Sequence, residues 1–347
     1  MLRKSRDLPA RRGFPDRRRE IILRATIVSG SLLLAAGVAE FATRLYVFGP
    51  AALSYTAMRS IHRSGQSGAL QKSAHPDLGY ELKPNLELLF KLAPVRINSR
   101  GLNDQEYSTE KDDNTFRVVV VGDSFTMPVG VAIENAWHSL IEERLGRHNP
   151  RRVEFINFAV AGYSLDQEVA SLQHKALAYK PDLVILGFCA ENDFQLPSNH
   201  TNIWLHGPNR EANGFSRIYL FDLIDLALAG QRSPFPRRYT EHQIAYVRNQ
   251  FGRLQALASG VGARAVVAYL HLGLEDPVPI QRLALDAGLD FVDAGAPLRG
   301  GSPARYFIYM FDGHPNAAAN LIFADVIGRH LLDEKLIPTA ATTELSR

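Results

Sequence analysis

Ser124 is the first residue whose type and position could do chemistry. It lies in RVVVVGDSFTMP (residues 117–128), where Gly122 and Asp123 separate it from a run of four valines that is typical of a buried strand. A serine hydroxyl becomes an effective nucleophile when a base takes its proton and N–H groups hold the developing oxyanion. Its place at the carboxyl end of a predicted strand favours this chemistry, because ligands bind at that edge of open α/β sheets. A turn serine without a catalytic role is the alternative interpretation.

Three later stretches supply the groups that such a serine would need. Gly162 follows a second apolar run, and a glycine lets its backbone N–H approach a ligand closely. Asn192 follows a third run and offers a side-chain amide. Asp312 and His314, in FDGHPN (311–316), offer an acid and a base two residues apart. The sequence therefore predicts a nucleophilic site assembled from loops at one edge of a sheet.

The elements that would position these residues alternate along the chain as strand and helix. The strand runs are short, rich in β-branched residues and without clean alternation, as expected for strands buried on both faces of a parallel sheet. Strands alternating with helices imply right-handed crossovers and a three-layer α/β/α domain. The predicted strands are residues 117–122, 153–160, 183–189, 264–270 and 290–295.

Four polar residues or short motifs predict where the intervening helices begin. Capping boxes stand at residues 164–167, before a helix that stops at Pro181, and at residues 240–243, before a helix that runs to Gly260. Asn135 is expected to cap a helix that ends at Gly146, and Asn316 to cap the last one.

In their order along the chain, these motifs resemble the SGNH hydrolase superfamily, the GDSL-type esterases and acyltransferases. The resemblance covers residues 117–332, and HPDLGYELKPN with NSRGLND in the preceding segment also looks like membrane-anchored bacterial members. It implies a flavodoxin-like fold with a five-stranded, mostly parallel sheet. It also implies a catalytic triad of Ser124, Asp312 and His314, and an oxyanion hole formed by Ser124, Gly162 and Asn192.

Two departures from the family pattern bear on these roles. Ala190 stands where the third motif usually has glycine, as in Gly-x-Asn-Asp. The last motif is Asp-x-His instead of Asp-x-x-His, a spacing that also looks like that of relatives acting in exopolysaccharide O-acetylation. The shorter spacing concerns Asp312 more than His314, and Asp293, at the end of the fifth predicted strand, is an alternative acid.

The N-terminal residues read as a membrane anchor. Residues 1–24 carry nine lysines and arginines against three acids, a net charge of +6 within a chain of net charge +3, and residues 25–39 are uncharged. The positive-inside rule then predicts a single-pass anchor with the N-terminus in the cytoplasm. The resemblance to membrane-anchored bacterial members implies that this membrane is the bacterial inner membrane and that the enzyme domain is periplasmic. A signal peptide cleaved near Gly37 and Ala39, or a buried helix, are the alternatives.

Composition and spacing exclude several other classes of protein. Beyond the basic tail the chain has a net charge of −3, which disfavours nucleic-acid binding. Cys189 is the one cysteine and is expected in the core, so a cysteine-based metal cluster is excluded. His138, His271 and the other histidines show no metal-ligand spacing and are expected at the surface or in loops. With no Walker-type loop or dinucleotide fingerprint, no metal or cofactor is predicted.

The expected organisation follows from these boundaries. It comprises a basic tail (1–24), a transmembrane anchor (25–48), a stalk and extended lead-in (49–115), the hydrolase-like domain (116–335) and a C-terminal tail (336–347). Within the domain, residues 194–239 are expected to form an insertion or lid beside the site, with an extra packed helix as the alternative.

The predicted activity is that of an esterase that cleaves or transfers a small acyl group, acetyl by family analogy, on an extracytoplasmic glycan. An acylated glycan or small ester is thus the expected substrate, and a polysaccharide-assembly complex a possible partner. A lipid-ester or thioester hydrolase and a catalytically silent scaffold in polysaccharide assembly are the alternatives.

Overall fold

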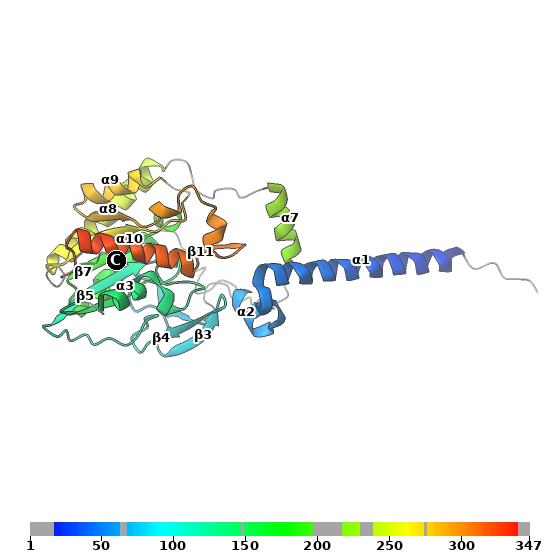
Figure 1. Ribbon diagram of the computed structural model, residues 1–347, viewed down its shortest axis with the longest axis horizontal. Coiled ribbons are helices and arrows are strands. Elements are labelled where there is room, and N and C mark those ends of the chain that lie inside the picture. The colour runs from blue at the N-terminus through cyan, green and yellow to red at the C-terminus, as the bar shows by residue number, and fades with distance from the viewer. Residues whose placement is uncertain are drawn as a thin grey trace, which may run out of the picture.

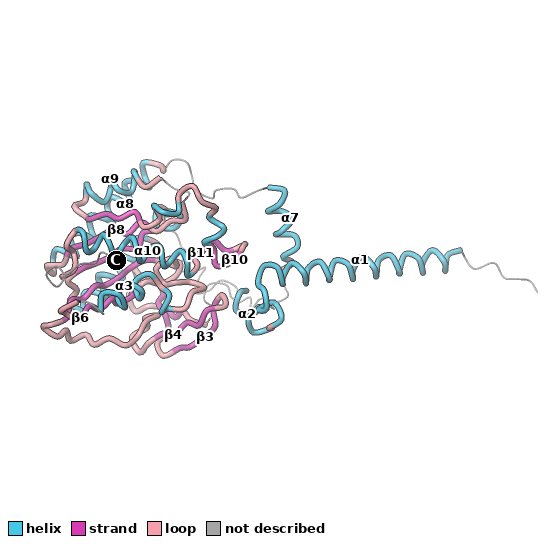
Figure 2. The backbone as a smooth tube through the Cα atoms, in the orientation of Figure 1, coloured by secondary structure: helices cyan, strands magenta, loops and turns pink. Residues whose placement is uncertain are grey.

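The computed structural model describes residues 17–62, 68–146, 149–196, 217–229, 239–273 and 276–338. Within them, a parallel sheet with helices on both faces forms the main body, and a long N-terminal helix projects from it (Figures 1 and 2). The sheet has five strands in the order β6-β5-β7-β8-β9, which confirms the predicted flavodoxin-like α/β/α architecture. Its strands are β5 (Thr115–Gly122), β6 (Arg152–Asn157), β7 (Leu183–Phe188), β8 (Arg264–Tyr269) and β9 (Asp290–Asp293).

The strand order places the chain's change of direction at the centre of the sheet. From β5 the chain crosses to β6 on one side and then returns to β7 on the other. Loops that leave neighbouring strands in opposite directions open a crevice at their carboxyl ends, where ligands bind in such folds. The ends of β5 and β7 carry Ser124 and Asn192.

The four valines of β5 are fully buried and serve both faces of the sheet. Because side chains alternate along a strand, Val119 and Val121 join the core under one set of helices, and Val118 and Val120 join the core on the opposite face. The first core includes α4 (Leu165–His174), α8 (Glu241–Gly260) and α9 (Val278–Asp286). The second includes α3 (Trp137–Gly146) and α10 (Ala317–Asp333).

Three of the four predicted helix starts are confirmed. Capping boxes precede α4 and α8, and the Asn316 side chain accepts a hydrogen bond from the Ala319 N–H at the start of α10. The prediction for Asn135 is wrong, since Asn135 lies in a separate 3₁₀ turn (Ile133–Asn135) and α3 begins at Trp137. The first N–H of α3 instead donates to the side chain of Asn320 in α10, a partner that local sequence does not reveal.

The segment before the sheet folds into two antiparallel hairpins, β1 (Leu70–Lys72) with β2 (Tyr80–Leu82) and β3 (Leu86–Phe90) with β4 (Ala93–Ile97). They share a hydrophobic core with the loops that follow β5 and β6. Tyr80 and Tyr163 also exchange hydrogen bonds with this region, Tyr80 to the Ala161 carbonyl and Tyr163 to the Tyr80 carbonyl. The hairpins therefore support the loops on which the predicted site depends.

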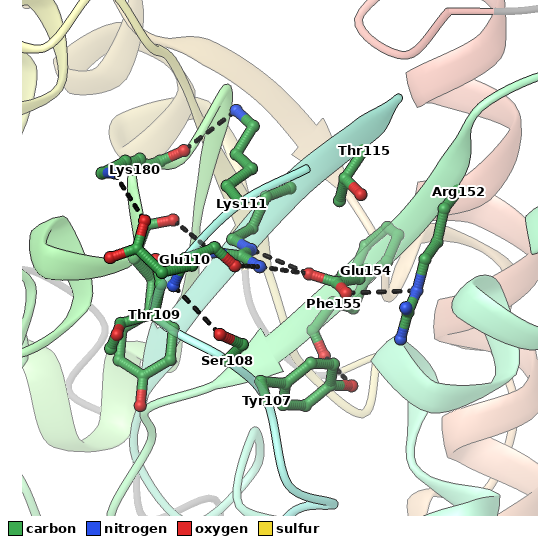
Figure 3. Close-up of polar contacts among 12 residues, drawn as sticks. Tyr107, Ser108, Thr109, Glu110, Lys111, Thr115, Arg152, Glu154, Phe155 and Lys180 are labelled. Carbon is green, nitrogen blue, oxygen red and sulfur yellow. Dashed lines mark hydrogen bonds and ion pairs between the residues drawn. The ribbon is translucent and has the colours of Figure 1, made fainter. Parts of the chain in front are cut away.

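The end of this segment crosses the amino ends of the strands, far from the predicted site. Figure 3 shows Tyr107 donating to the Phe155 carbonyl and Lys111 donating to the Lys180 carbonyl. Glu154 of β6 forms a buried ion pair with Arg117, its neighbour in β5. Polar contacts thus cover the amino ends of the strands, whereas the loops of the predicted site lie at the carboxyl ends.

The N-terminal helix α1 (Arg17–Phe48) is long and apolar enough to cross a membrane, with a mean hydropathy of 1.9 over its most apolar window. A 3₁₀ turn (Gly49–Leu53) and the short helix α2 (Tyr55–His62) join it to the hairpins. Of the predicted insertion, the structure describes residues 194–196, 217–229 and 239, and the central part forms α7 (Tyr219–Ala229). Residues 197–216 and 230–238, like the first 16 residues of the basic tail and residues 339–347, lie outside the described residues.

Candidate active site

The turn after β5 presents Ser124 at the edge of the sheet. The Asp123 carboxylate accepts a hydrogen bond from the Phe125 N–H at 2.9 Å, and its carbonyl accepts one from Met127 at 2.8 Å. Gly122 is required by close approach, because a Cβ there would lie 2.4 Å from the Thr126 hydroxyl oxygen. Asp123 is buried by this turn while Ser124 stays half-exposed. The GDS sequence therefore builds the turn with its glycine and acid and leaves the serine accessible.

The loops after β6 and β7 meet beside this turn. Gly162 has a φ of 81°, a conformation that glycine adopts without strain. The Asn192 side chain donates to the carbonyl of Tyr163, the residue after Gly162. A hydrogen bond from Asn192 also favours the charged form of Asp123, although burial raises the pKa of Asp123 overall. The structure thus brings the predicted Gly162, Asn192 and Ser124 segments together.

Ala190 fits its position without strain. It begins the short helix α5 (Ala190–Asp193) and is absent from the residues with positive φ. A glycine is therefore not needed to turn the backbone here, and the departure from Gly-x-Asn-Asp leaves Asn192 in place.

Asp312 and His314 lie in the hairpin formed by β10 (Phe307–Tyr309) and β11 (Asp312–Pro315). In an extended strand, residues two apart point to the same side. The His314 Nδ1 atom accordingly contacts the Asp312 carboxylate, which also accepts the His314 backbone N–H at 3.2 Å. The strand conformation explains how the shorter Asp-x-His spacing keeps the acid and the base in contact.

The imidazole of His314 lies next to the Ser124 turn. Its ring centroid is 6.1 Å from that of Phe125, the residue after Ser124. His314 is also close enough to affect Asp123, the residue before Ser124. Burial raises the pKa of Asp123, and the charge of His314 partly offsets that rise. The hairpin therefore delivers its histidine to the turn that carries the predicted nucleophile.

Lys91 is a member of the site that the sequence did not predict. Burial alone would raise the pKa of Asp312, but His314 and the Lys91 ammonium together hold it well below its usual value. Lys91 lies in the turn between β3 and β4, where Lys91 and Leu92 both have positive φ, and its Nζ contacts the second carboxylate oxygen of Asp312. No motif links a hairpin lysine to an acid 221 positions later.

Asp293, the alternative acid, has other partners. It accepts a hydrogen bond from His271 at 2.7 Å and forms an ion pair with Arg299. The expected surface or loop position is wrong for His138, which is buried in α3, whereas His271 does lie in a loop, the one after β8, but is buried there. Burial lowers the pKa of His271 to about 4 and that of His138 to about 3, because the low-dielectric interior disfavours an imidazolium.

A group of buried acids lies beneath the loops. Glu168 in α4 and Asp193 in α5 are fully buried, and burial raises the pKa of each far above its usual value. The charges of neighbouring acids add to this effect, Asp193 acting on Glu168 and Asp123 acting on Asp193. Asp193 also accepts the Cys189 N–H at 2.7 Å and so fixes the turn that carries Asn192. Among the described residues, no three His, Cys, Asp or Glu side chains are grouped to hold a metal ion.

The fold and the meeting of these loops are those of a serine hydrolase built on an open parallel sheet. A model of the GDSL-like lipase/acylhydrolase family matches residues 120–322, more than half of the chain. The chain therefore belongs to this family and is a hydrolase that acts on ester bonds. No curated protein matches its sequence.

Several solved structures are similar at low identity. TesA is 17% identical over 64% of this chain and 99% of its own, with a TM-score of 0.40. An acetylxylan esterase from Geobacillus stearothermophilus is 14% identical over 62% of this chain and 94% of its own, with a TM-score of 0.40. A two-domain esterase active on acetylated mannans is 16% identical over 67% of this chain and 53% of its own, with a TM-score of 0.43. At this level, they say nothing about the substrate of this chain.

Proposed function

We propose that the protein is an esterase that removes or transfers a small acyl group through an acyl-Ser124 intermediate. The observation that carries the proposal is the Asp312–His314 pair, whose imidazole lies against Phe125 and so beside the nucleophile turn. A base oriented by an acid next to a half-exposed serine is the arrangement that activates a hydroxyl.

The reaction follows from these positions. His314 Nε2 takes the proton of the Ser124 hydroxyl as its oxygen attacks the ester carbonyl, and Asp312 stabilises the resulting imidazolium. The alcohol leaves with the proton from His314. A water molecule, or the hydroxyl of an acceptor, then attacks the acyl-enzyme in the same way.

The oxyanion of each tetrahedral intermediate is held by the backbone N–H groups of Ser124 and Gly162 and by the Asn192 amide. The free enzyme holds that amide against Tyr163 and Asp123. One of its two N–H groups therefore turns to the substrate when the ester binds.

The first experiment labels the purified full-length protein with a serine-directed fluorophosphonate and measures hydrolysis of an activated acetyl ester. We expect labelling and turnover in the wild type and in Ser108→Ala, an exposed serine in the segment before the sheet. Ser124→Ala should lose both while keeping its circular dichroism spectrum. Full activity in Ser124→Ala would disprove the assignment, and an unlabelled wild type would favour the silent scaffold.

The proposed substrate is an acetyl ester on a glycan outside the cytoplasm. The location is supported by the position of the enzyme domain after α1, with a basic tail that the positive-inside rule keeps in the cytoplasm. The acetyl group and the glycan rest on the resemblance of the Asp-x-His spacing to that of relatives acting in exopolysaccharide O-acetylation. Acetate release from an acetylated glycan, compared with acetate transfer to an unacetylated one, separates hydrolysis from transfer. The mass of the mature protein tests whether α1 is retained as an anchor or removed as a signal sequence, and a C-terminal periplasmic reporter tests the topology.

A further inference from the structure

Helix α7 is the longest described part of the predicted insertion, and its first residues contact α1. Figure 1 shows α7 starting beside the end of α1 that adjoins the enzyme domain and extending away from α1 at a steep angle. The Glu40 carboxylate of α1 accepts the first N–H groups of α7, from Tyr219 at 3.2 Å and Leu220 at 2.9 Å. An acid at a helix start satisfies free N–H groups and complements the helix dipole. The start of α7 is therefore fixed to one turn of α1.

Glu40 and Arg44 interrupt the apolar sequence of α1, and α7 gives both of them a role. They form an ion pair at 2.7 Å, in which the Arg44 side chain is 5% exposed. Arg44 also donates to the carbonyl of Arg217, just before α7, at 2.8 Å. Charged residues in a membrane-spanning helix are costly unless paired, so their pairing here points to a built junction.

The two faces of α7 differ in their surroundings. Tyr219 is 2% exposed and packs edge-on against Phe48 at the end of α1. Phe221, Ile224 and Leu228 follow at the spacing of one helix face, and they are 65%, 45% and 83% exposed. One side of α7 is thus bound to the protein, while an apolar stripe on another side faces outward.

The length of α1 determines where the apolar stripe of α7 would lie relative to a bilayer that α1 spans. From Arg24 to Arg44 a helix rises about 30 Å, which equals the thickness of the hydrocarbon core of a bilayer. If these arginines mark the two interfaces, the first turn of α7 lies at the outer one. A helix that leaves α1 there at a steep angle, as α7 does in Figure 1, runs along the membrane plane, where amphipathic helices bury their apolar face.

We propose that α7 is an interfacial helix that lays Phe221, Ile224 and Leu228 on the outer surface of the bilayer that α1 spans. The occupant of the stripe is lipid, and the proposal rests on the membrane topology proposed above for α1. The protein side of α7 reaches the candidate active site, because Tyr219 stacks on Phe311, the residue before Asp312, at 5.8 Å. Contact of α7 with lipid then holds the catalytic hairpin at a fixed distance from the membrane.

The test places an environment-sensitive fluorophore at single cysteines of the full-length protein in a Cys189→Ala background. Phe221→Cys reports on α7, Leu33→Cys on the middle of α1, and Leu285→Cys on the outer side of α9; the native side chains are 65%, 74% and 57% exposed. The protein is reconstituted at one copy per nanodisc of phosphatidylethanolamine and phosphatidylglycerol, with or without brominated acyl chains.

We expect bromine to quench the probes at positions 33 and 221 and to leave that at position 285 unchanged. Quenching at 33 with none at 221 would overturn the interfacial helix and leave the anchor intact. No quenching at 33 would overturn the anchor and the proposal together. Discs loaded with two copies are the comparison. If the probe at position 221 were shielded from bromine only in those discs, the occupant of the stripe would be a second copy of the protein and not lipid. Ester hydrolysis by each variant, measured in parallel, separates these outcomes from failure of the proposed activity.

Discussion

At the scale of residues, the contact of Asp312 with His314 favours Asp312 over Asp293 as the acid of the proposed triad. Asp312 contacts His314 Nδ1, whereas Asp293 is held by His271 and Arg299. We expect Asp312→Asn to lower kcat by about 10⁴-fold, the loss caused by the equivalent change in another Ser-His-Asp triad. Asp293→Asn, the matched control, should keep kcat within a small factor of the wild type. Steady-state kinetics on an activated acetyl ester measure both, and a larger loss in Asp293→Asn would reverse the assignment.

Lys91, in the β3–β4 hairpin, contacts Asp312 and favours the ionised form of its carboxylate. Since its ammonium helps to hold the pKa of Asp312 below the ordinary value, a neutral side chain raises that pKa. Removing the positive charge also makes it easier for the hydrogen-bonded Asp312–His314 pair to take up a proton, so the acidic limb of kcat/KM should move to higher pH in Lys91→Met. Lys91→Arg should restore the profile, and Lys72→Met, at an exposed lysine in β1, should not change it. An unshifted limb in Lys91→Met would show that the contact is only structural.

At the scale of elements, the turn that carries Asn192 rests on the buried acids of α4 and α5. The pKa of Glu168 is raised from 4.5, so the folded state binds a proton that the unfolded chain has released. The free energy of unfolding therefore falls as the pH rises above about 4.5, and the stability from this proton is fully present only below that pH. Glu168→Gln should flatten this slope and be more stable than the wild type at pH 8.

Urea unfolding at several pH values measures the slope. Glu87→Gln, an exposed glutamate in β3, is the matched control and should keep the slope of the wild type. The same slope in Glu168→Gln and the wild type would place the titrating group elsewhere.

The elements also show what the sequence could predict. The strands are recognisable because the four valines of β5 need burial on both faces, and the capping boxes mark α4 and α8 by local hydrogen bonds. Contacts between distant segments leave no such pattern. Three contacts join residues far apart in the chain: α3 with Asn320, Asp312 with Lys91, and α7 with Glu40. The loops of the site were therefore predictable as sheet-edge positions, whereas their supports were not.

At the scale of the whole molecule, helix α1, the proposed anchor, meets the sheet domain in a small, mainly aromatic cluster. Phe48, at the end of α1, packs against Tyr219 of α7 and against Tyr309 of the β10–β11 hairpin. The distances between ring centroids are 4.8 Å and 5.2 Å. This cluster is separate from the two cores that cover the faces of the sheet. Its loss should loosen the junction and the hairpin without unfolding the sheet.

Phe48→Ala tests this division. Removing a buried phenylalanine costs about 3–5 kcal/mol where the structure cannot collapse around the cavity. Hydrogen exchange should therefore speed up in α2, α7 and the β10–β11 hairpin, while β5 and β7 keep the protection of the wild type. Phe251→Ala, in the core under α8, is the control and should speed up exchange across the sheet instead. Because Asp312 lies in the loosened hairpin, Phe48→Ala should also lower kcat, although Phe48 belongs to the anchor. Uniform loss of protection in Phe48→Ala would instead mean that anchor and sheet unfold as one cooperative unit.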